Sequence, residues 1–531
     1  MSETALQQRV DRLFESAIEE TGQSHALKSM NRELRLAHER IKQPMRVAIV
    51  GLIKAGKSTL MNALLGETVV ATGTVEATFN VNWLKYGQNP SLVVHFKDDR
   101  PPEPKSLDDL EQLTRRSDAY REYLLAIKYI EVFYPNKILH TMNLIDTPGL
   151  ASFYGADSDN TRKFLELYGE DLTATTHQEA ANADAVLYLF SHSIAAEDTL
   201  MLEMFQGPKM GHVNPINSIG VLTRVDAFWP QCDDALDGGQ EIIASLQNDH
   251  PHLRRLFYSI LPMCGLLAWG AQTLTNEEFT ILLELAQISE GRFRRILRDA
   301  AMFTTREYDD VPISPILREA VLDRLGQYGI WQAYRILQSG VNDQETLTQA
   351  LLRTSGLPML KDLILSHFGN RAFLIKLDTA LRQIEIACFW ARQRESIQGQ
   401  DREILKRVET GFGQLRDQEQ GFYELSVLRD YYQGKLPLTE NEVQHLLQVT
   451  GEHGLSDRQR LGLPEIEGEL TESDLREMLA RAREYAGYWR RRAIDPGASR
   501  EVENASGVLG DAYDRISYQL LETMKLHGFT V

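Results

Sequence analysis

Residues 47–65 constrain the fold of this chain more than any other stretch. They read VAIVGLIKAGKSTLMNALL, so a short apolar strand pattern runs directly into G-x-x-x-x-G-K-S and then into helix-forming residues. Glycines in such a turn let backbone N–H groups surround phosphate oxygens, and the following helix points its positive amino-terminal end at them. The stretch therefore predicts a phosphate-binding loop; the alternative is a glycine-rich turn beside a surface lysine.

The residue types in this loop predict separate roles. Gly51 and Gly56 leave room for the phosphates, and Lys57 reaches the terminal phosphates with its ammonium group. Ser58 is expected to bind Mg²⁺ where the helix begins. The nucleotide contacts expected from this part of the chain are Gly51, Lys54, Ala55, Gly56, Lys57, Ser58 and Thr59.

A second motif, Asp146-Thr147-Pro148-Gly149, follows an apolar strand pattern. An aspartate at the carboxyl end of a strand opposite the phosphate loop can hold Mg²⁺ through water, and a glycine amide can bond the terminal phosphate. Asp146 and Gly149 are therefore expected at the phosphate end of the nucleotide.

A third motif, Thr223-Arg224-Val225-Asp226, also follows an apolar strand pattern. The carboxylate of Asp226 can accept two hydrogen bonds from guanine N1 and N2, a donor pair that adenine lacks, so the site is expected to prefer GTP over ATP. Thr223 and Arg224 are the other expected contacts here. Cys264 and Gly265 are candidates for the loop that closes over the base, although the apolar end of a core strand would look the same.

The order of these motifs predicts a doubly wound α/β domain with the nucleotide at the carboxyl ends of the strands. Strands are expected at residues 79–86, 92–96, 129–134, 142–145, 185–190, 216–222 and 257–264, with an insertion at 98–125. Gly51 and Asp146 lie 146 − 51 = 95 positions apart, so the GTPase domain is enlarged. A helical insertion is expected at about 270–354, and a helix that returns to the domain is expected to begin at 355–358.

Helical periodicity dominates the two ends of the chain. Apolar residues recur at helical spacing in residues 3–40, from Leu374 to Cys388, from Leu405 to Phe422, and in a last helix stopped by Gly528. These stripes predict an antiparallel bundle built from both termini, with a separate carboxyl-terminal helical domain as the alternative. The predicted domains are residues 1–42 (helices that join the bundle), 43–370 (an enlarged GTPase domain with a mixed, mostly parallel sheet) and 371–531 (the helical bundle or stalk).

Composition narrows the function classes. The chain has 531 residues, 43% hydrophobic and 25% charged, and a formal net charge of −18, which argues against broad nucleic-acid binding. Its three cysteines have no paired spacing, so neither a zinc site nor a disulfide framework is predicted. Without a signal-peptide pattern or a long apolar run, a cytoplasmic location is expected, with any membrane contact peripheral at the inner face of the cell membrane.

The motifs resemble those of the bacterial dynamin-like proteins, large GTPases of the dynamin superfamily. The resemblance rests on GLIKAGKSTLMNALLG at 51–66, ATGTVEAT at 71–78, DTPGL at 146–150 and LTRVD at 222–226. It implies that Thr78 ligates Mg²⁺ and helps to hold the attacking water. Ser58, Thr78 and Asp146 (through water) are then the expected metal site, and Lys54, Lys57 and Thr78 the expected catalytic residues.

Two positions depart from related GTPases. Leu150 stands where small regulatory GTPases carry a water-orienting glutamine, so hydrolysis needs help from elsewhere. Lys54 stands where eukaryotic dynamins carry a serine that binds a charge-compensating cation. A lysine there is expected to act as a built-in cation that reaches the phosphates on dimerisation; the alternative is a lysine that points outward or pairs with an acidic residue.

The resemblance implies a mechanochemical GTPase that uses GTP/GDP and Mg²⁺. Its GTPase domains would dimerise and move a helical stalk, and its partners would be further copies of itself, a peripheral membrane or a second dynamin-like chain, with no nucleic acid. The alternative is a GTP-dependent scaffold or switch that recruits a protein without remodelling a membrane. Aromatic and basic residues at 485–492 suit either a headgroup surface or packing within the bundle, and packing is the favoured interpretation.

Overall fold

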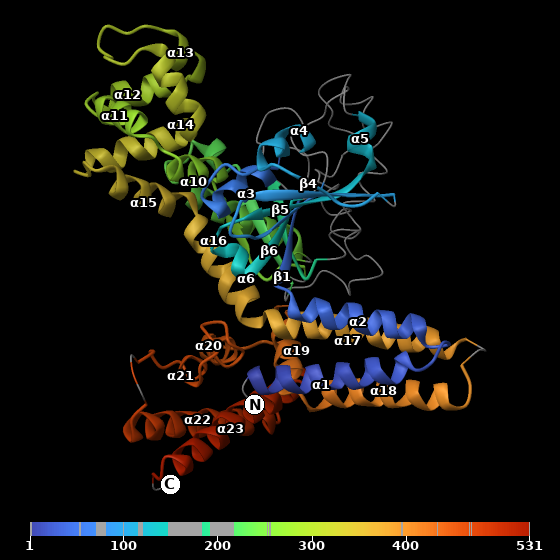
Figure 1. The fold of residues 1–531 in the computed structure, drawn as a ribbon. Helices are drawn as coiled ribbons and strands as arrows, with labels where there is room; N and C mark the ends of the chain where they lie inside the picture. The colour runs from blue at the N-terminus through green and yellow to red at the C-terminus, as the bar shows by residue number, and fades with distance from the viewer. Residues whose placement is uncertain are drawn as a thin grey trace. The chain divides into compact units, whose positions relative to one another are not determined.

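The computed structural model describes most of the chain as two compact units. The described residues are 3–51, 55–70, 81–98, 100–114, 121–146, 183–191, 217–251, 253, 256–394, 397–432, 434–466, 468 and 470–529. One unit comprises residues 46–208 and 217–364, and the other is built mainly from residues 1–45 and 365–531 (Figure 1). Each unit has its own secondary structure and is described separately below.

A nine-stranded sheet forms the centre of the first unit. Its spatial order is β4-β3-β5-β2-β6-β1-β7-β8-β9. The strands span β1 (Met45–Gly51), β2 (Asn82–Tyr86), β3 (Ser91–Phe96), β4 (Glu103–Lys105), β5 (Ile127–Tyr134), β6 (Met142–Asp146), β7 (Ala185–Ser191), β8 (Ser218–Thr223) and β9 (Ile260–Pro262).

Strands β1, β7, β8 and β9 pair in parallel, with Val47 opposite Ala185, Val186 opposite Ser218, and Gly220 opposite Ile260. Nearly every residue of β1, β7 and β8 is buried, as expected for parallel strands covered on both faces. Parallel strands end at a common edge of the sheet, so the chain segments that follow these strands gather there.

The other half of the sheet is mixed. Strand β2 runs parallel to β5 and antiparallel to β6, and β3 is antiparallel to both β4 and β5. Two sequence expectations are corrected here. The insertion at 98–125 contributes β4 to the edge of the sheet, where Pro104 is tolerated. The last strand covers only Ile260–Pro262 of the expected 257–264, because the chain turns into a helix at Gly265.

Helices surround this sheet. They are α3 (Lys57–Leu65), α4 (Leu110–Thr114), α5 (Arg121–Ala126), α6 (Ile138–Thr141), α9 (Ala235–Asp249), α10 (Gly265–Gln272) and α16 (Leu357–Leu363), with short 3-10 turns η1 (Leu107–Asp109) and η3 (Val225–Phe228). The helical insertion consists of α11 (Asn276–Leu285), α12 (Glu290–Leu297), α13 (Ala300–Thr305), α14 (Pro315–Gln338) and α15 (Gln344–Ser355). Figure 1 shows the insertion on the side of this unit opposite β4 and α5.

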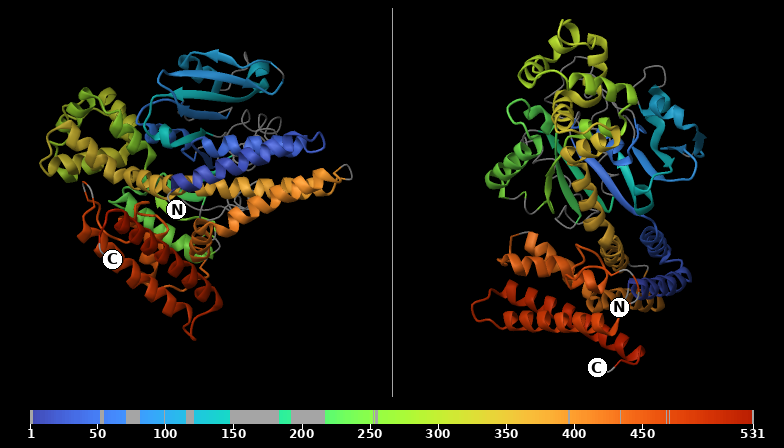
Figure 2. Two further views of the ribbon diagram at one scale, coloured as in Figure 1. Left: turned by 60° about the horizontal axis from the view of Figure 1, so that its bottom comes forward. Right: turned by 90° about the vertical axis from the view of Figure 1, so that its left-hand side faces the viewer.

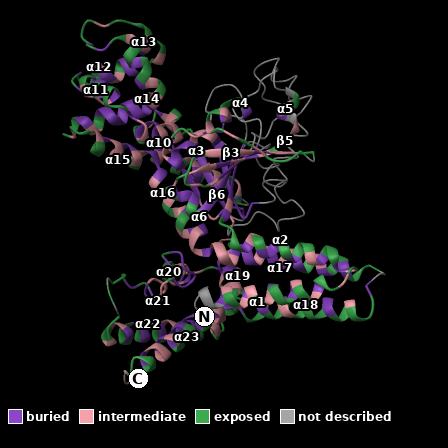
Figure 3. Cartoon of the chain, viewed as in Figure 1, coloured by how far each residue is buried: buried purple, intermediate pink, exposed green. Residues whose placement is uncertain are grey.

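In the second unit, four antiparallel helices share one apolar core. They are α1 (Glu3–Gly22), α2 (Lys28–Lys42), α17 (Asn370–Arg392) and α18 (Gln400–Gln418), and they lie side by side in both views of Figure 2. Phe14, Leu34, Leu377 and Leu405 are among the fully buried residues of this core. Figure 3 shows the buried residues as stripes along these helices, which is the pattern that their apolar spacing predicted.

The remaining helices of this unit form a second apolar core. They are α19 (Gln420–Tyr432), α20 (Glu440–Val449), α21 (Asp457–Arg460), α22 (Glu472–Ala493) and α23 (Arg500–Leu526). One expectation is corrected, because α18 ends at Gln418 and Phe422 lies on α19. The predicted fold class, an α/β GTPase-type domain with a helical bundle built from both termini, is confirmed.

The aromatic and basic residues at the end of α22 belong largely to this second core. Trp489 is fully buried, and Arg492 pairs with Glu442 at 2.9 Å and with Asp495 at 2.8 Å. The packing interpretation of residues 485–492 therefore fits the structure better than a headgroup surface. Among the residues that the structure describes, no helix is both long and apolar enough to cross a bilayer.

Candidate functional site

The phosphate loop joins the central strand β1 to helix α3. At Gly51 an added β-carbon would lie only 2.4 Å from the carbonyl oxygen of Leu189 on β7, so no larger residue fits between these strands. Gly56 has φ +90°, a backbone conformation that other residues rarely adopt, and among the described residues an added β-carbon there would meet no atom within 4 Å. Gly51 thus allows close packing of β1 against β7, and Gly56 allows the backbone turn at the amino-terminal end of the nine-residue helix α3.

Lys57 is the first residue of α3 and lies almost entirely inside the protein, at 7% exposure. Its Nζ donates a hydrogen bond to the carbonyl oxygen of Gly51 at 3.1 Å. Burial lowers the pKa of the Lys57 ammonium to about 8, and the charge of Asp146 opposes that shift. Lys57 is therefore held at the loop with Asp146 close enough to act on its charge.

Oxygen ligands suited to Mg²⁺ come from two elements. Asp146 is the last residue of β6 and is fully buried, and Ser58 is the second residue of α3. A hydroxyl and a carboxylate are the hard ligands that Mg²⁺ prefers, together with water and substrate phosphates. In the described part of the chain no group of three or more His, Cys, Asp or Glu side chains is placed to hold a metal.

The third motif leaves β8 beside the phosphate loop. The Thr223 hydroxyl, which is buried, lies 2.8 Å from the carbonyl oxygen of Ala55 and 3.1 Å from that of Phe190. Arg224 has φ +59° and is exposed, and Asp226 is half-buried in the turn η3. Thr223 therefore connects β8 to the phosphate loop, while Arg224 and Asp226 are accessible to a ligand.

Cys264 follows β9 and caps helix α10. Its Sγ accepts a hydrogen bond from the Leu267 N–H at 3.4 Å, and its own N–H donates to the Ser355 carbonyl oxygen at 2.9 Å. Burial raises the pKa of the Cys264 thiol well above its usual range, and the Asp226 carboxylate beside it adds to the shift. The thiol is therefore protonated, and it lies next to the carboxylate that is expected to read the base.

The loop after Cys264 also borders the phosphate-loop helix. An added β-carbon at Gly265 would lie 3.5 Å from Thr59 Cγ2, which is ordinary van der Waals contact. The structure thus brings ten predicted residues to one edge of the sheet: Gly51, Ala55, Gly56, Lys57, Ser58, Thr59, Asp146, Thr223, Arg224 and Asp226, with Cys264 beside Asp226. The other three, Lys54, Thr78 and Gly149, lie outside the described residues, as does Leu150.

Several polar residues that hold this site together have no motif around them. Asn62 bonds the backbone of residues 69 and 70, and Trp269 Nε1 donates to Thr68 Oγ1 at 3.0 Å. Gln272 Nε2 donates to the Ala63 carbonyl oxygen at 2.9 Å. In the sequence, only the asparagine among the apolar residues of α3 indicates such contacts. Trp269 and Gln272 lie more than 200 positions from the residues that they bond.

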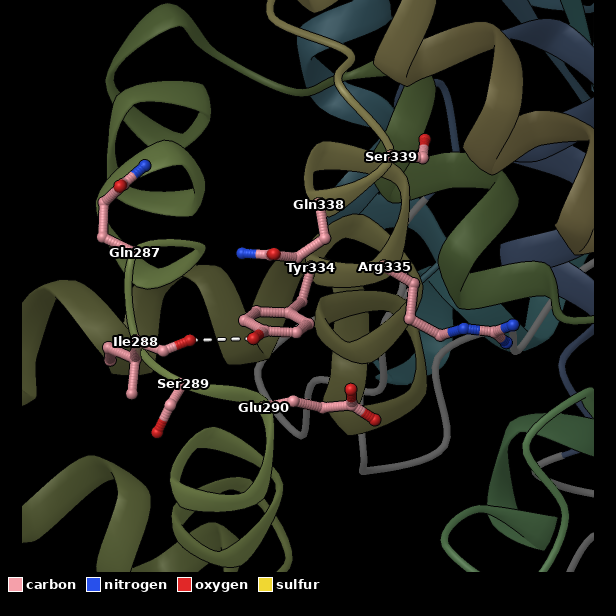
Figure 4. Close-up of a pocket in the computed structure, with 8 residues that line it drawn as sticks. All are labelled: Gln287, Ile288, Ser289, Glu290, Tyr334, Arg335, Gln338 and Ser339. Carbon is pink, nitrogen blue, oxygen red and sulfur yellow. Dashed lines mark hydrogen bonds between the residues drawn. The ribbon is translucent and has the colours of Figure 1, made fainter.

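A separate pocket of about 480 Å³ lies in the helical insertion (Figure 4). The Tyr334 side chain extends across this pocket, and its hydroxyl donates a hydrogen bond to the Ile288 carbonyl oxygen at 2.8 Å. Its lining is Gln287, Ile288, Ser289, Glu290, Tyr334, Arg335, Gln338 and Ser339. None of these residues belongs to the three motifs, so this pocket is distinct from the phosphate loop.

The parallel strands, the phosphate loop between β1 and α3 and the turn that follows β8 define a P-loop domain of the GTPase type. Within it, residues 47–225 match the family model described as the Dynamin family. Together with the four motifs, this match shows that this part of the chain is similar to the dynamin-type GTPases.

Curated relatives extend the similarity beyond that domain. The isoniazid-induced protein IniC of Mycobacterium tuberculosis (strain ATCC 25618 / H37Rv) is 28% identical over 461 residues, which are 86% of each chain. Dynamin-like protein 2 of Campylobacter jejuni is 32% identical over 126 residues, 24% of this chain and 20% of the relative. A solved structure of an oligomerised bacterial dynamin pair, described in connection with the sensing and tethering of membranes, is 14% identical, with a TM-score of 0.35 over 99% of this chain and 92% of that one.

Proposed function

We propose that this protein binds and hydrolyses GTP with Mg²⁺ as a dynamin-like mechanochemical enzyme. One observation carries the proposal: the ends of β1, β6 and β8 bring Lys57, Asp146 and Asp226 to a common edge of the sheet, at the start of α3. A phosphate binder, a metal ligand and a base reader are the three parts that a guanine nucleotide needs.

At the phosphate end, Lys57 supplies a positive charge at the start of α3. Its ammonium lies at the Gly51 carbonyl, and a bound phosphate would stabilise the protonated form. Ser58 and Asp146 would hold Mg²⁺, which neutralises charge that develops on the phosphate oxygens during transfer. Thr78, Gly149 and Lys54 complete the proposed set through the resemblance to dynamin-like proteins.

At the base end, Asp226 selects guanine in this proposal. Its half-buried carboxylate has the Cys264 thiol beside it, and Thr223 links the same turn to the phosphate loop at Ala55. A carboxylate facing adenine would lose both of its hydrogen bonds, a discrimination that binding sites of this type can make large. Arg224, which is exposed, is proposed to stack on the base.

Hydrolysis is proposed to drive movement of the helical bundle through dimerisation of the GTPase domains. Higher oligomers, a second dynamin-like chain and a peripheral membrane are the proposed partners, in line with the family and with relatives named as dynamin-like. The GTP-dependent scaffold that recruits a protein without remodelling a membrane is the alternative that the experiments below separate.

Steady-state hydrolysis of GTP and of ATP, each with Mg²⁺, tests the enzymatic part of the proposal. We expect turnover with GTP that is abolished by Lys57→Ala and by removal of Mg²⁺, with little turnover of ATP. Lys97→Ala is a matched control, because Lys97 is an exposed lysine of the same unit with no role in the site. Equal turnover of both nucleotides, or full activity of Lys57→Ala, would contradict the assignment.

Sedimentation with liposomes tests the coupling to membranes. The protein is mixed with anionic or neutral vesicles in the presence of GDP or a non-hydrolysable GTP analogue, and vesicle shape is followed by electron microscopy. Binding with deformation supports the mechanochemical function. Absence of binding across lipid mixtures, in a protein that hydrolyses GTP, supports the scaffold.

A further inference from the structure

His445 lies in the middle of α20 and contacts a group of aromatic rings from α22 and α23. The nearest ring is that of Tyr485, with 4.0 Å between the two ring centroids, and the others belong to Tyr488, Trp489 and Tyr513. The Tyr513 hydroxyl also donates a hydrogen bond to the His445 carbonyl oxygen at 2.9 Å. One histidine of α20 therefore contacts both long helices of the second core.

These surroundings favour the neutral form of the imidazole. Among the residues that the structure describes, the buried Nδ1 of His445 has no hydrogen-bond partner. A neutral imidazole carries one N–H, whereas an imidazolium carries an N–H on both nitrogens, so protonation would place a charged group where its N–H meets no acceptor. The Tyr485 ring already has the Arg481 guanidinium 5.9 Å from its centroid, and a charged His445 would be a second cation beside this ring.

Charged groups on α20 and α22 also act on His445. On α20, Glu442 favours the protonated form, but its carboxylate already accepts a hydrogen bond from Arg492 at 2.9 Å. On α22, Glu484 favours protonation and Arg481 opposes it. Burial has the largest effect, and it lowers the pKa of His445 below the ordinary value of histidine.

The carboxyl-terminal end of α20 is bonded to a helix of the other apolar core, which is shared by α1, α2, α17 and α18. Arg371 on α17 donates to the Thr450 carbonyl oxygen at 3.1 Å and forms an ion pair with Glu452. Thr450 directly follows α20. Helix α20 therefore connects the second core, through His445, with the first turn of α17.

We propose that His445 is a pH-sensitive latch, which holds α20 against α22 and α23 while it is neutral and loosens α20 when it is protonated. The folded form binds this proton less readily than a form in which α20 has detached. The latch is therefore closed above the ordinary pKa of histidine and weakens as the pH falls below that value. Loosening of α20 also weakens the connection between the two helical cores, and this role does not depend on the nucleotide site.

Two carboxylates of the same core respond to acid in the opposite direction. Burial raises the pKa of Glu424 on α19 and that of Asp457 on α21. Their folded forms bind a proton more readily than their unfolded forms, so a fall in pH stabilises the helices that carry them. A loss of stability in mildly acidic solution therefore cannot come from these two groups.

Hydrogen exchange of the full chain at about pH 7.5 and about pH 5.5 tests the latch, with rates corrected for the intrinsic effect of pH. We expect the protection of the amides of residues 440–449 to fall about threefold to tenfold, because proton binding favours the open form by up to about tenfold at one pH unit below the ordinary pKa. The amides of α1 and α2 serve as an internal reference and should keep their protection. Nuclear magnetic resonance of ¹³C-labelled histidine follows the titration of His445 itself.

His445→Phe keeps an aromatic ring at this position but cannot be protonated, so its α20 should be equally protected at both pH values. If this variant does not fold, His445→Gln, which also does not titrate, takes its place. His453→Gln is the matched control, because His453 is an exposed histidine in the turn after α20. It should lose protection at the lower pH as the wild-type protein does.

The outcomes separate the latch from a histidine that only packs. Loss of protection at the lower pH in the wild-type protein and His453→Gln, but not in the His445 variant, supports the proposal. Equal loss in the wild-type protein and the His445 variant overturns it. So does a wild-type α20 that is equally protected at both pH values, or a His445 that titrates at or above the ordinary pKa of histidine.

Discussion

The hydroxyl of Thr223 lies 2.8 Å from the carbonyl oxygen of Ala55, and this hydrogen bond connects the end of β8 to the phosphate loop. The two residues are 223 − 55 = 168 positions apart, and both lie within the part of the chain that the sequence assigned to nucleotide contacts. In the structure, the Thr223 hydroxyl bonds backbone oxygens of other segments of the protein, Ala55 and Phe190. The turn proposed to read the base and the loop proposed to bind the phosphates therefore share one buried hydrogen bond.

Thr223→Val should weaken the site at both ends. Valine has nearly the same shape but no hydroxyl, so it leaves the Ala55 carbonyl oxygen without this donor, a loss of about 1–3 kcal/mol. We expect a lower melting temperature and several-fold weaker binding of GTP and GDP alike, measured by calorimetry. Thr223→Ser retains the hydroxyl and should restore most of the affinity. If the valine variant bound GTP and GDP with wild-type affinity, the hydrogen bond would not contribute to nucleotide binding.

Asp226→Asn should change which base is bound. An amide presents a donor where guanine also donates, so GTP affinity should fall by at least about tenfold while xanthosine triphosphate gains relative to GTP. Competition binding with the two nucleotides measures the switch directly. Asp233→Asn, a change in the same region at a carboxylate that pairs with Arg294, should leave the base preference unaltered. Unchanged GTP affinity in the Asp226 variant would rule out its role as base reader.

Nucleotide affinity should depend on pH through Lys57. Its pKa in the free protein is lowered to about 8, so the ammonium that attracts phosphate is present below that pH and is lost as the pH rises through it. Affinity for GDP should be flat below pH 7 and fall above pH 8, approaching tenfold per pH unit, because binding must then restore the proton. In Lys57→Arg, whose guanidinium stays charged, no inflection near pH 8 is expected. A wild-type curve that is flat up to pH 9 would contradict the lowered pKa.

Lys54→Ala tests the predicted built-in cation. The variant should keep nucleotide affinity within a few-fold and lose about tenfold to a thousandfold in turnover, as removal of a transition-state contact does. The wild-type protein should be activated by raising its own concentration and should need no added potassium. Wild-type turnover in the variant at high protein concentration would eliminate Lys54 as a catalytic residue.

Arg492→Ala should destabilise the second helical core. Arg492 bonds Glu442, whose side chain is only 2% exposed, so the variant leaves a buried carboxylate with fewer donors. We expect the free energy of unfolding to fall by about 1–3 kcal/mol in denaturant titrations. Arg491→Ala changes the next residue, which is exposed, and should stay within about 0.5 kcal/mol of the wild-type value. Equal effects of the two changes would argue against the packing role.

The sequence predicted those features whose chemistry is local. The phosphate loop needs Gly51, Gly56 and Lys57 at fixed spacing between a strand and a helix. That pattern can be recognised from the sequence alone. Apolar runs likewise identified the central strands, because parallel strands are buried on both faces. The exact limits predicted for the three domains, and the roles of the individual site residues, remain predictions.

Features that depend on tertiary pairing were not accessible from the sequence. Strand β4 is three residues long and contains Pro104, so only its pairing with β3 makes it a strand. The separation of Phe422 from α18 depends on a break at Glu419 that the apolar spacing conceals. Asn62 had no visible partner, because its acceptors and donors are backbone groups that carry no residue-specific signal.

The hydrogen bond between the Cys264 N–H and the Ser355 carbonyl oxygen has a consequence for how this domain can vary. These residues are 355 − 264 = 91 positions apart, yet the chain at Ser355 lies beside Cys264 again, directly before Gly356 at the start of α16. The helices between these two residues therefore belong to one long closed loop of the chain. The entropic cost of closing such a loop grows only slowly with its length. Helices can therefore be added to or removed from its outer part without moving the base-reading turn or the start of α16, which makes this the place where the domain can change size at little cost.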